Sequence, residues 1–384
     1  MKARALAFAA AFWLARPCDA VEKAGSTAAP VLQVPMGSRA IGMGSAFTAV
    51  ASDVSALYYN PAGLSRLNAQ EAAFTYISGL SDNNLQQIAY GGPLPFSGIS
   101  GNGYASAGGS LLLAQDGTIE VNRTNPDGSF LSTQNLSAGS DLVATGGYAE
   151  RVGTTPLDVK ETSYGINHFI GITGKFVRST LVQQYSAHAF TADVGYLVNS
   201  PEAGLSFGLS ALNIGGQLKY ADVGDPLPTT LRSGLAYQGS PSESQVVTFA
   251  TDAEYLVNEQ TWHVNAGLEY FLAKTYGFRI GYQFMQDAIG LTAGFGFRWR
   301  SRVLIDYAWV NSGALSDSHR FTISYRFGGV TPAVRGRPRR PYIEALPEKE
   351  QRDIDEETPP APPAPRPRPA SREEHPGGVS GWIY

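Results

Sequence analysis

The sequence predicts an all-β protein: a transmembrane, antiparallel, up-and-down β-barrel of about 14 strands, with an N-terminal plug in its lumen and a disordered Pro-rich C-terminal tail. Three observations predict this fold. Between Glu71 and Gly328, apolar and polar residues alternate with a period of two, in segments of roughly ten residues separated by turns. Glycine is abundant, with 43 residues, and aromatic residues make up 11%. Charged residues make up only 16%, well below the roughly 25% of soluble domains.

Residues 1–20 have the pattern of a secretory signal peptide. Lys2 and Arg4 give a basic start, an apolar run follows, and a small-residue cleavage site ends at Ala20. The only cysteine is Cys18, so cleavage after Ala20 removes every thiol. No later stretch holds about 18 consecutive apolar residues, so strands are expected to cross the membrane. The net charge of −4 shows no basic face, which argues against nucleic acid as a partner.

Residues 21–69 form a segment that precedes the strands, and its core, 37–64, is rich in Gly and Ala. Asp53 is a plausible N-cap for a short helix, and Pro61 favours an extended Asn60, so this helix is predicted to end before Asn60. We interpret the core as a lumenal plug or hatch, with a plain lead-in to the first strand as the alternative. The residues expected to shape or gate the plug are Arg39, Gly42, Gly44, Asp53, Tyr58, Tyr59, Asn60 and Pro61.

Residues 70–328 are predicted to form the barrel. In 276–284, for example, Tyr276, Phe278 and Ile280 share one face, while Gly277 and Arg279 lie on the other. A soluble sandwich also alternates, but large aromatics at the strand ends of the apolar face favour a membrane barrel. The fourteen predicted strands are centred near residues 75, 88, 109, 145, 170, 192, 208, 234, 250, 266, 280, 293, 306 and 323.

The connections between these strands alternate in length. Two long ones, 115–139 and 215–228, fall on the predicted outer side, and short ones such as 199–203 fall on the inner side. The segment 151–163 is an exception, because it is long on the predicted inner side. Both ends of the barrel then lie on the inner side, as in bacterial outer-membrane barrels.

The polar face of the strands carries isolated charges of both signs. They are predicted to line the lumen, either as a polar interior that holds the plug or as a ring that selects the substrate. The lumen-facing candidates are Asp252, Glu254, His263, Glu269, Arg279, Arg298, Asp306 and Arg326.

Motifs for catalysis, metals and cofactors are not supported. Residues 204–208 match Gly-x-Ser-x-Gly, but Ser206 lies in an alternating run with no helix after it, so the match is interpreted as a coincidence. The five histidines lack ligand spacing. We therefore expect no metal, no cofactor and no enzymatic activity.

Residues 329–384 form the tail, which contains half of the 24 prolines. Its composition predicts an extended, disordered spacer in the periplasm. Its last three residues, 382–384, are either a short docking tip for a periplasmic partner or a frayed terminus.

Two stretches also carry a resemblance to a known family. The first is 39–44 followed by 58–63, and the second is Leu212-Asn213-Ile214-Gly215-Gly216 followed by 227–228 and 231–235. With the strand repeat, residues 37–328 resemble the PorV/PorQ family, which is related to FadL-type outer-membrane transport barrels. The resemblance implies a fourteen-stranded barrel whose N-terminal segment plugs the lumen. The Pro-rich tail departs from the family, whose barrels end at the last strand.

The resemblance implies two alternative functions. FadL-type members pass hydrophobic small molecules across the outer membrane, and PorV acts in type IX protein secretion. We therefore expect a bacterial outer-membrane protein surrounded by lipid. Its cargo is expected to be either a hydrophobic small molecule or an exported protein.

Overall fold

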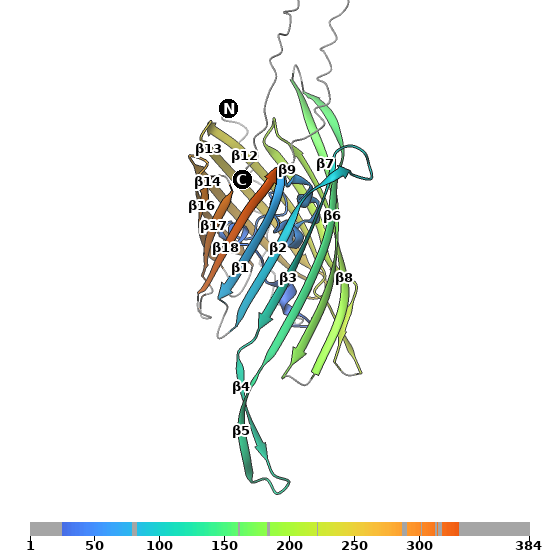
Figure 1. Cartoon of the computed structure of the whole chain (residues 1–384), viewed down its shortest axis with the longest axis vertical. Helices are drawn as coiled ribbons and strands as arrows, with labels where there is room; N and C mark the ends of the chain where they lie inside the picture. Colours follow the sequence, from blue (N-terminus) through green and yellow to red (C-terminus); the bar gives the residue numbers. More distant parts are fainter. Residues whose placement is uncertain are drawn as a thin grey trace, which may run out of the picture. The chain divides into compact units, whose positions relative to one another are not determined.

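The computed structural model describes residues 25–329, except 79–82, 160–161, 183–184, 221, 286–289, 301, 312 and 314–316. Fourteen antiparallel strands close into one barrel, with neighbours in chain order (Figure 1). These strands are β1 (Ala69–Ser78), β2 (Asn84–Ser97), β3 (Tyr104–Gln115), β6 (Gly139–Val159), β7 (Thr162–Leu181), β8 (Tyr185–Ser200), β9 (Leu205–Ile214), β12 (Thr230–Ser242), β13 (Gln245–Leu256), β14 (Thr261–Leu272), β15 (Tyr276–Phe284), β16 (Leu291–Trp299), β17 (Val303–Val310) and β18 (Ser318–Gly329).

The predicted barrel is confirmed strand by strand. Each of the fourteen expected centres falls within one of these strands, and β1 pairs with β18 to close the barrel. Closure leaves no barrel strand without two neighbours, which is what a sheet in hydrocarbon requires. We call the rim where β1 begins and β18 ends the terminal rim, and the opposite rim the hairpin rim.

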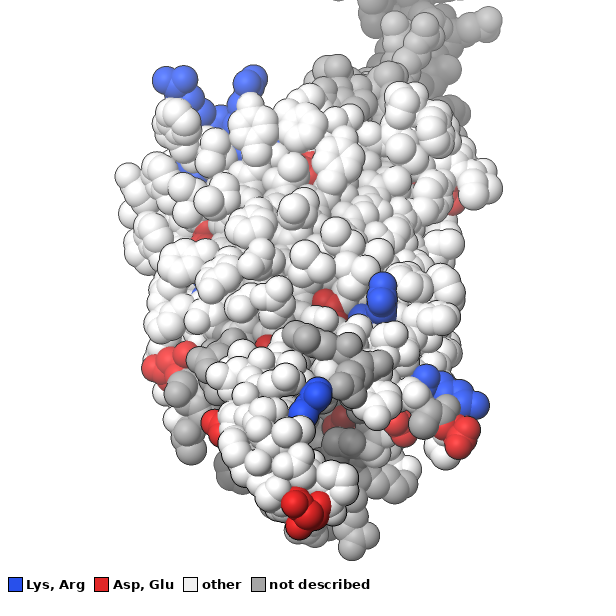
Figure 2. All heavy atoms as spheres, turned by 60° about the horizontal axis from the view of Figure 1, so that its bottom comes forward, with Lys and Arg blue, Asp and Glu red and all other residues white. Residues whose placement is uncertain are grey.

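The strand faces also follow the alternation. In β15, Tyr276, Phe278 and Ile280 are each more than two-fifths exposed on the outer wall, while Gly277 and Arg279 are buried inside. The wall seen in Figure 2 is mostly uncharged, and the Lys, Arg, Asp and Glu side chains gather toward its ends. Such an apolar outer wall is suited to contact with lipid.

The long connections are more ordered than expected. The segment 115–139 contains a hairpin of β4 (Thr118–Thr124) and β5 (Phe130–Ser137), which projects from the hairpin rim (Figure 1). The segment 215–228 contains the short pair β10 (Gln217–Lys219) and β11 (Gly224–Pro226).

The segment 151–163, expected as a long connection, is mostly strand instead. β6 and β7 continue past the terminal rim and pair with each other as far as Val159 and Thr162. Each satisfies the backbone groups of the other there, so the chain needs no irregular loop at this point.

From residue 25 onward, where the structure describes the chain, the N-terminal segment contains four short helices: η2 (Pro30–Gln33), α2 (Ser38–Gly42), α3 (Ala56–Tyr59) and η3 (Pro61–Arg66). In Figure 1 they occupy the inside of the barrel. Within the described residues, no helix is long and apolar enough to cross a membrane. The predicted signal peptide, 1–20, and the Pro-rich tail beyond Gly329 lie outside the described residues.

Candidate functional site

The N-terminal segment runs through the barrel from the hairpin rim to the terminal rim. At the hairpin rim the backbone N–H of Ala28 donates to the carbonyl of Pro226 at 3.0 Å, and Gln33 Nε2 donates to Glu259 Oε1 at 3.0 Å. At the other end, Leu67 leads directly into β1 at the terminal rim. Between these points nearly every side chain from 40 to 51 is fully buried. We call residues 28–67 the plug.

The wall receives the plug through glycines on its inner face. A side chain at Gly208 or Gly234 would meet the backbone nitrogen of Ala49 at 3.1 Å, and one at Gly294 would meet Gly42 Cα at 3.0 Å. These contacts leave no room for a Cβ atom. Nine strands each supply one such glycine against the plug: Gly108, Gly147, Gly171, Gly195, Gly208, Gly234, Gly267, Gly281 and Gly294.

These glycines change the interpretation of the polar face. The sequence predicted a polar lumen on this face, whereas seven of the nine glycines lie against the plug backbone. The other two, Gly108 and Gly147, lie against the side chains of Leu57 and Leu64. The plug residues Gly42 and Gly44 are the counterpart on the other side, because Gly44 lies against the backbone of β14 and β15. The interior is therefore filled, and two backbones approach each other where neither carries a side chain.

Asn60 ties the middle of the plug together. Its backbone is extended, with φ −160°, and α3 ends at Tyr59, as the following Pro61 predicts. Its Oδ1 accepts from the backbone N–H of Ala62 and caps η3. Its Nδ2 donates to the carbonyls of Thr48 in the plug and Tyr196 in β8, at 3.0 and 3.1 Å. One fully buried amide thus joins two turns of the plug to the wall.

A chain of ion pairs anchors the plug near the terminal rim. Arg39 donates to both oxygens of Glu269, at 2.9 and 2.7 Å, and also to Asp53 at 3.1 Å. Arg279 donates to the same Glu269 at 2.7 Å and to Asp306 at 2.6 Å. Glu269 and Arg279 are almost fully buried, so each charge depends on its partners. We call these five residues the anchor network.

Asp53 also accepts hydrogen bonds within the plug, in addition to its ion pair with Arg39. Its Oδ1 accepts from the backbone N–H and the hydroxyl of Ser55. It therefore stabilises the turn that leads into α3. The prediction that Asp53 is the N-cap is wrong, because α3 begins at Ala56 and its N-cap is Ser55.

Arg232 forms a second polar anchor that sequence reasoning did not include among the lumen-facing residues. Its guanidinium donates to the carbonyl of Ser45 at 2.9 Å and to Thr48 Oγ1 at 3.2 Å, and it pairs with Asp252 and Glu254. It also lies 5.1 Å from the centre of the Tyr59 ring. The signal was present, because Leu231 and Leu235 face outward and the alternation then places Arg232 inside.

Asp252, which pairs with Arg232 and stands opposite Gly234, binds the plug backbone directly. Its Oδ2 accepts from the backbone N–H groups of Phe47 and Thr48, both at 2.9 Å. A fully buried carboxylate that accepts from two N–H groups fixes this turn of the plug in position.

The remaining predicted lumen-facing residues have mixed surroundings. Arg326 Nε donates to Glu71 at 2.6 Å, a partner that the sequence did not suggest. Arg298 lies over the ring of Phe271 at 4.8 Å. His263 pairs in register with Glu254 across β13 and β14.

Apolar side chains fill the other end of the interior, near the hairpin rim. The plug supplies Val31, Leu32 and Met36 from η2 and the residues after it. The wall and its β10–β11 connection surround them with aliphatic side chains. The buried members of this apolar cluster are Ala29, Val31, Leu32, Met36, Ile77, Leu85, Leu112, Ala114, Val143, Val177, Ala187, Ala189, Leu218 and Leu227.

Two small internal cavities mark these two environments. One, of about 40 Å³, is lined by anchor residues such as Arg39 and Asp53 together with Glu71 and Arg326. The other, of about 30 Å³, is lined mainly by the apolar cluster, with Lys175 as its charged neighbour. Lys175 is itself paired with the buried Asp193 at 2.9 Å. Volumes of this size hold a few water molecules and no larger ligand.

Burial shifts the ionisation of the plug side chains. It raises the pKa of Tyr58 and Tyr59 well above the usual range, which keeps both neutral. It lowers the pKa of Arg66 to about 10, so Arg66 stays charged at neutral pH and donates to the carbonyls of 49–51. For Arg39, burial lowers the pKa, but the nearby carboxylate of Glu269 outweighs it and raises the pKa above its usual range.

Chemistry other than anchoring finds little support in the described part of the chain. Ser206 lies within β9 opposite Ala236, so the sharp strand-to-helix turn of a catalytic serine is absent at this position. Among the described residues, no group of three His, Cys, Asp or Glu side chains is placed to hold a metal ion.

One family model matches the N-terminal part of the chain. Residues 8–107 match the Uncharacterised protein family (UPF0164). No curated protein matches the chain. The name PorV/PorQ, suggested by the sequence resemblance, stays a prediction.

Several solved structures are similar to about three quarters of the chain. The P. putida toluene transporter TodX has 13% identity and a TM-score of 0.48, covering 76% of this chain and 98% of its own. The Ralstonia pickettii toluene transporter TbuX has 12% identity and a TM-score of 0.47, covering 76% and 98%. A Pseudomonas aeruginosa FadL homologue has 12% identity and a TM-score of 0.38, covering 77% and 99%.

Proposed function

We propose that this chain is a non-enzymatic bacterial outer-membrane barrel that passes hydrophobic small molecules past its N-terminal plug. The observation that carries the proposal is the apolar cluster at the hairpin rim, where η2 occupies a site that the wall lines with aliphatic side chains. A site of this kind accepts an apolar molecule in place of Val31, Leu32 and Met36 with little change in chemistry.

The two ends of the plug differ in how easily they move. At the terminal rim, each ion pair of the anchor network requires one geometry, and separating buried partners is costly. At the hairpin rim, η2 is held by non-directional apolar contacts and by a few hydrogen bonds, including Gln33 to Glu259. We therefore infer that η2 moves aside during passage while α2 stays anchored.

Removing η2 tests this proposal. Deletion of residues 25–33 should increase uptake of an uncharged aromatic hydrocarbon probe by cells or by vesicles that contain the barrel. The matched variant carries Ser38→Cys and Thr322→Cys, which join α2 to β18 where the two hydroxyls lie 2.9 Å apart. The oxidised variant should keep its uptake, because α2 is not expected to move. Unchanged uptake after the deletion, or lost uptake in the locked variant, would contradict the proposed route.

A second function, the binding of exported protein cargo in secretion, is favoured by the β4–β5 hairpin. Among the described strands, this two-stranded sheet pairs with no other, and it exposes Phe130 and Leu131 by more than half. An isolated hairpin is marginally stable in water and gains from a partner. Removing residues 118–137 should then abolish surface display of an exported protein but leave probe uptake unchanged. The reverse result would favour the transport function alone.

We also propose a periplasmic partner for the tail, on the basis of its composition. Truncation after residue 330 should leave barrel assembly intact and abolish retention of that partner in a detergent pull-down. Loss of barrel assembly would instead make the tail part of the folding unit.

A further inference from the structure

A further cavity lies on the outer wall of the barrel. It has a volume of about 620 Å³ and crosses the strands β8, β9, β12, β13 and β14. Internal cavities of 30 to 40 Å³ are far too small for a ligand, whereas this volume falls in the range of roughly 300–1,000 Å³ that is typical of ligand sites. We call this hollow the wall groove.

Short side chains form the floor of the wall groove. Ser233 on β12 stands directly opposite Ala253 on β13, and Ala211 on β9 is the diagonal neighbour of Ser233. All three belong to the outward face, where the preceding and following outward positions carry large residues such as Leu209 and Leu231. Missing side-chain volume at three adjacent positions therefore makes the hollow.

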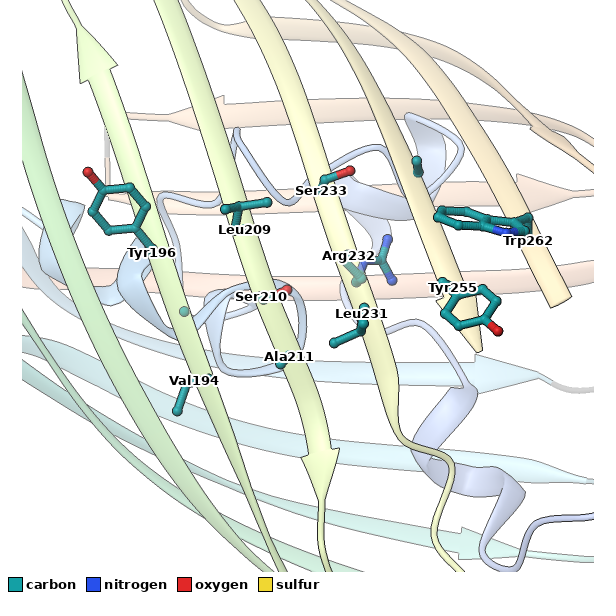
Figure 3. A pocket seen from close by; sticks show the side chains of 12 residues that line it. Val194, Tyr196, Leu209, Ser210, Ala211, Leu231, Arg232, Ser233, Tyr255 and Trp262 are labelled. Atoms are coloured by element: carbon teal, nitrogen blue, oxygen red, sulfur yellow. The ribbon is translucent and has the colours of Figure 1, made fainter. Parts of the chain in front are cut away.

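Large apolar side chains form the edges. Val194, Leu209, Leu231 and Trp262 are each more than two-fifths exposed around the floor (Figure 3). Tyr255 and Trp262 are in contact at the end nearest the hairpin rim, with ring centres 4.8 Å apart and ring planes tilted by 36°. Tyr and Trp at strand ends are typical of the boundary between hydrocarbon and headgroups.

No charge is available to a ligand in the wall groove. The guanidinium of Arg232, which contributes to the lining, is engaged on the inner side by Asp252, Glu254 and the plug. Ser210 likewise donates its hydroxyl inward, to the carbonyl of Tyr59 at 2.8 Å. Figure 3 shows the plug behind these strands. The outward chemistry is apolar except for the hydroxyl of Ser233 and the polar groups of Tyr196, Tyr255 and Trp262, and it offers no charge to a ligand.

We propose that the wall groove binds one acyl chain of a membrane lipid, with the headgroup of that lipid beside Tyr255 and Trp262. The inference rests on the proposed position of the barrel in the outer membrane. The groove is continuous with the apolar wall, where Leu235, Tyr237 and Phe249 on the same strands face the same surroundings. A flexible chain fills a narrow apolar hollow that the neighbouring lipids would otherwise leave empty. The bound lipid then covers the strands that hold the middle of the plug.

Tryptophan quenching tests this proposal. The signal comes from a variant in which Trp13, Trp299, Trp309 and Trp382 are replaced by Phe, so that Trp262 alone reports on the groove. A phospholipid with brominated chains is added to the full-length barrel in detergent micelles. Quenching of Trp262 should saturate near one lipid per barrel. A reciprocal variant that keeps only Trp299, on the opposite rim, should show quenching that rises without saturation.

Filling the floor provides the matched comparison. Ser233→Leu should shift half-saturation to about tenfold higher lipid, equivalent to about 1.4 kcal/mol of lost binding. Ala293 is an outward residue on β16 away from the groove, so Ala293→Leu should leave the lipid concentration at half-saturation unchanged. Parallel, unsaturated quenching of Trp262 and Trp299, or no effect of Ser233→Leu, would overturn the proposal.

Two further outcomes also count against it. Loss of Trp262 quenching together with a doubled mass would show that a second barrel covers the groove. Saturation by a free aromatic hydrocarbon but not by lipid would assign the groove to cargo.

A heat-dependent shift of the folded band in gel electrophoresis confirms that each variant is an intact barrel. A chain that stays soluble without detergent would contradict the outer-membrane function itself rather than the groove.

Discussion

The two ends of the plug are held by different physical means. Near the terminal rim, Arg39 enters a buried network of ion pairs, whereas near the hairpin rim, η2 rests on aliphatic side chains. Ion pairs in a buried site specify one arrangement, because a displaced charge loses its partners without regaining water. Apolar contacts depend on area and tolerate exchange. The difference indicates that the anchor network fixes the position of the plug. The plug can move more easily at the apolar cluster.

The largest expected effect comes from breaking the anchor network. Glu269→Gln keeps the shape of the side chain but leaves Arg39 and Arg279 without the charge that they share. We expect a loss of about 3–5 kcal/mol in the free energy of unfolding, measured by urea titration of the barrel in lipid vesicles. Glu259→Gln at the hairpin rim is the control, and it should cost much less. Equal losses for the two variants would remove the distinction between the ends.

Truncation of the apolar end should come next. Met36 is almost fully buried in the apolar cluster, and Met36→Ala should cost about 2–5 kcal/mol in the same titration. Repeating the titration with an added aromatic hydrocarbon distinguishes Met36→Ala from Glu269→Gln. The ligand should restore part of the stability of Met36→Ala, since it fits the cavity, and should do nothing for Glu269→Gln. Rescue of both variants would show that the ligand does not distinguish the two ends.

A smaller effect is expected from the glycines between the ends. An added methyl group at Gly171 would strike the backbone of Pro61 and Ala62, whereas Gly174 on the same strand has nothing within 4 Å of that position. Gly171→Ala should therefore cost about 1–3 kcal/mol, the usual penalty for overpacking. Gly174→Ala should be close to neutral. If the two variants unfold alike, the plug does not press on the wall as described.

The smallest effect should appear at alkaline pH. The folded pKa of Tyr59 is raised by burial above its unfolded value of about 10. The folded state then holds more protons than the unfolded state above pH 10, so stability falls as pH rises, by up to about 1.4 kcal/mol per pH unit. Tyr59→Phe should remove this part of the slope between pH 10 and 11. A slope that is identical in both proteins would show that Tyr59 does not contribute.

The polar residues of the interior show how far sequence reasoning reached. Strand phase predicted the side of the sheet for Glu269 and Arg279, because neighbouring residues in a strand must point to opposite faces. It did not predict that Arg39 bridges to Glu269, since the two are 230 residues apart and their contact depends on the path of the plug. Glu71 and Lys175 were missed altogether, although each occupies an inward position of its strand.

The sequence by itself determined the number of strands, their outward faces and the end of α3 before Asn60. These features follow from local rules: the period of two of an extended backbone and the restriction that Pro61 imposes on the residue before it. Only the tertiary structure decided that glycines of the wall face the plug, that Arg232 holds its middle, and that a groove opens on the outside. Each of these depends on which residues of distant strands stand side by side, and that is set by barrel closure and strand register rather than by any local pattern.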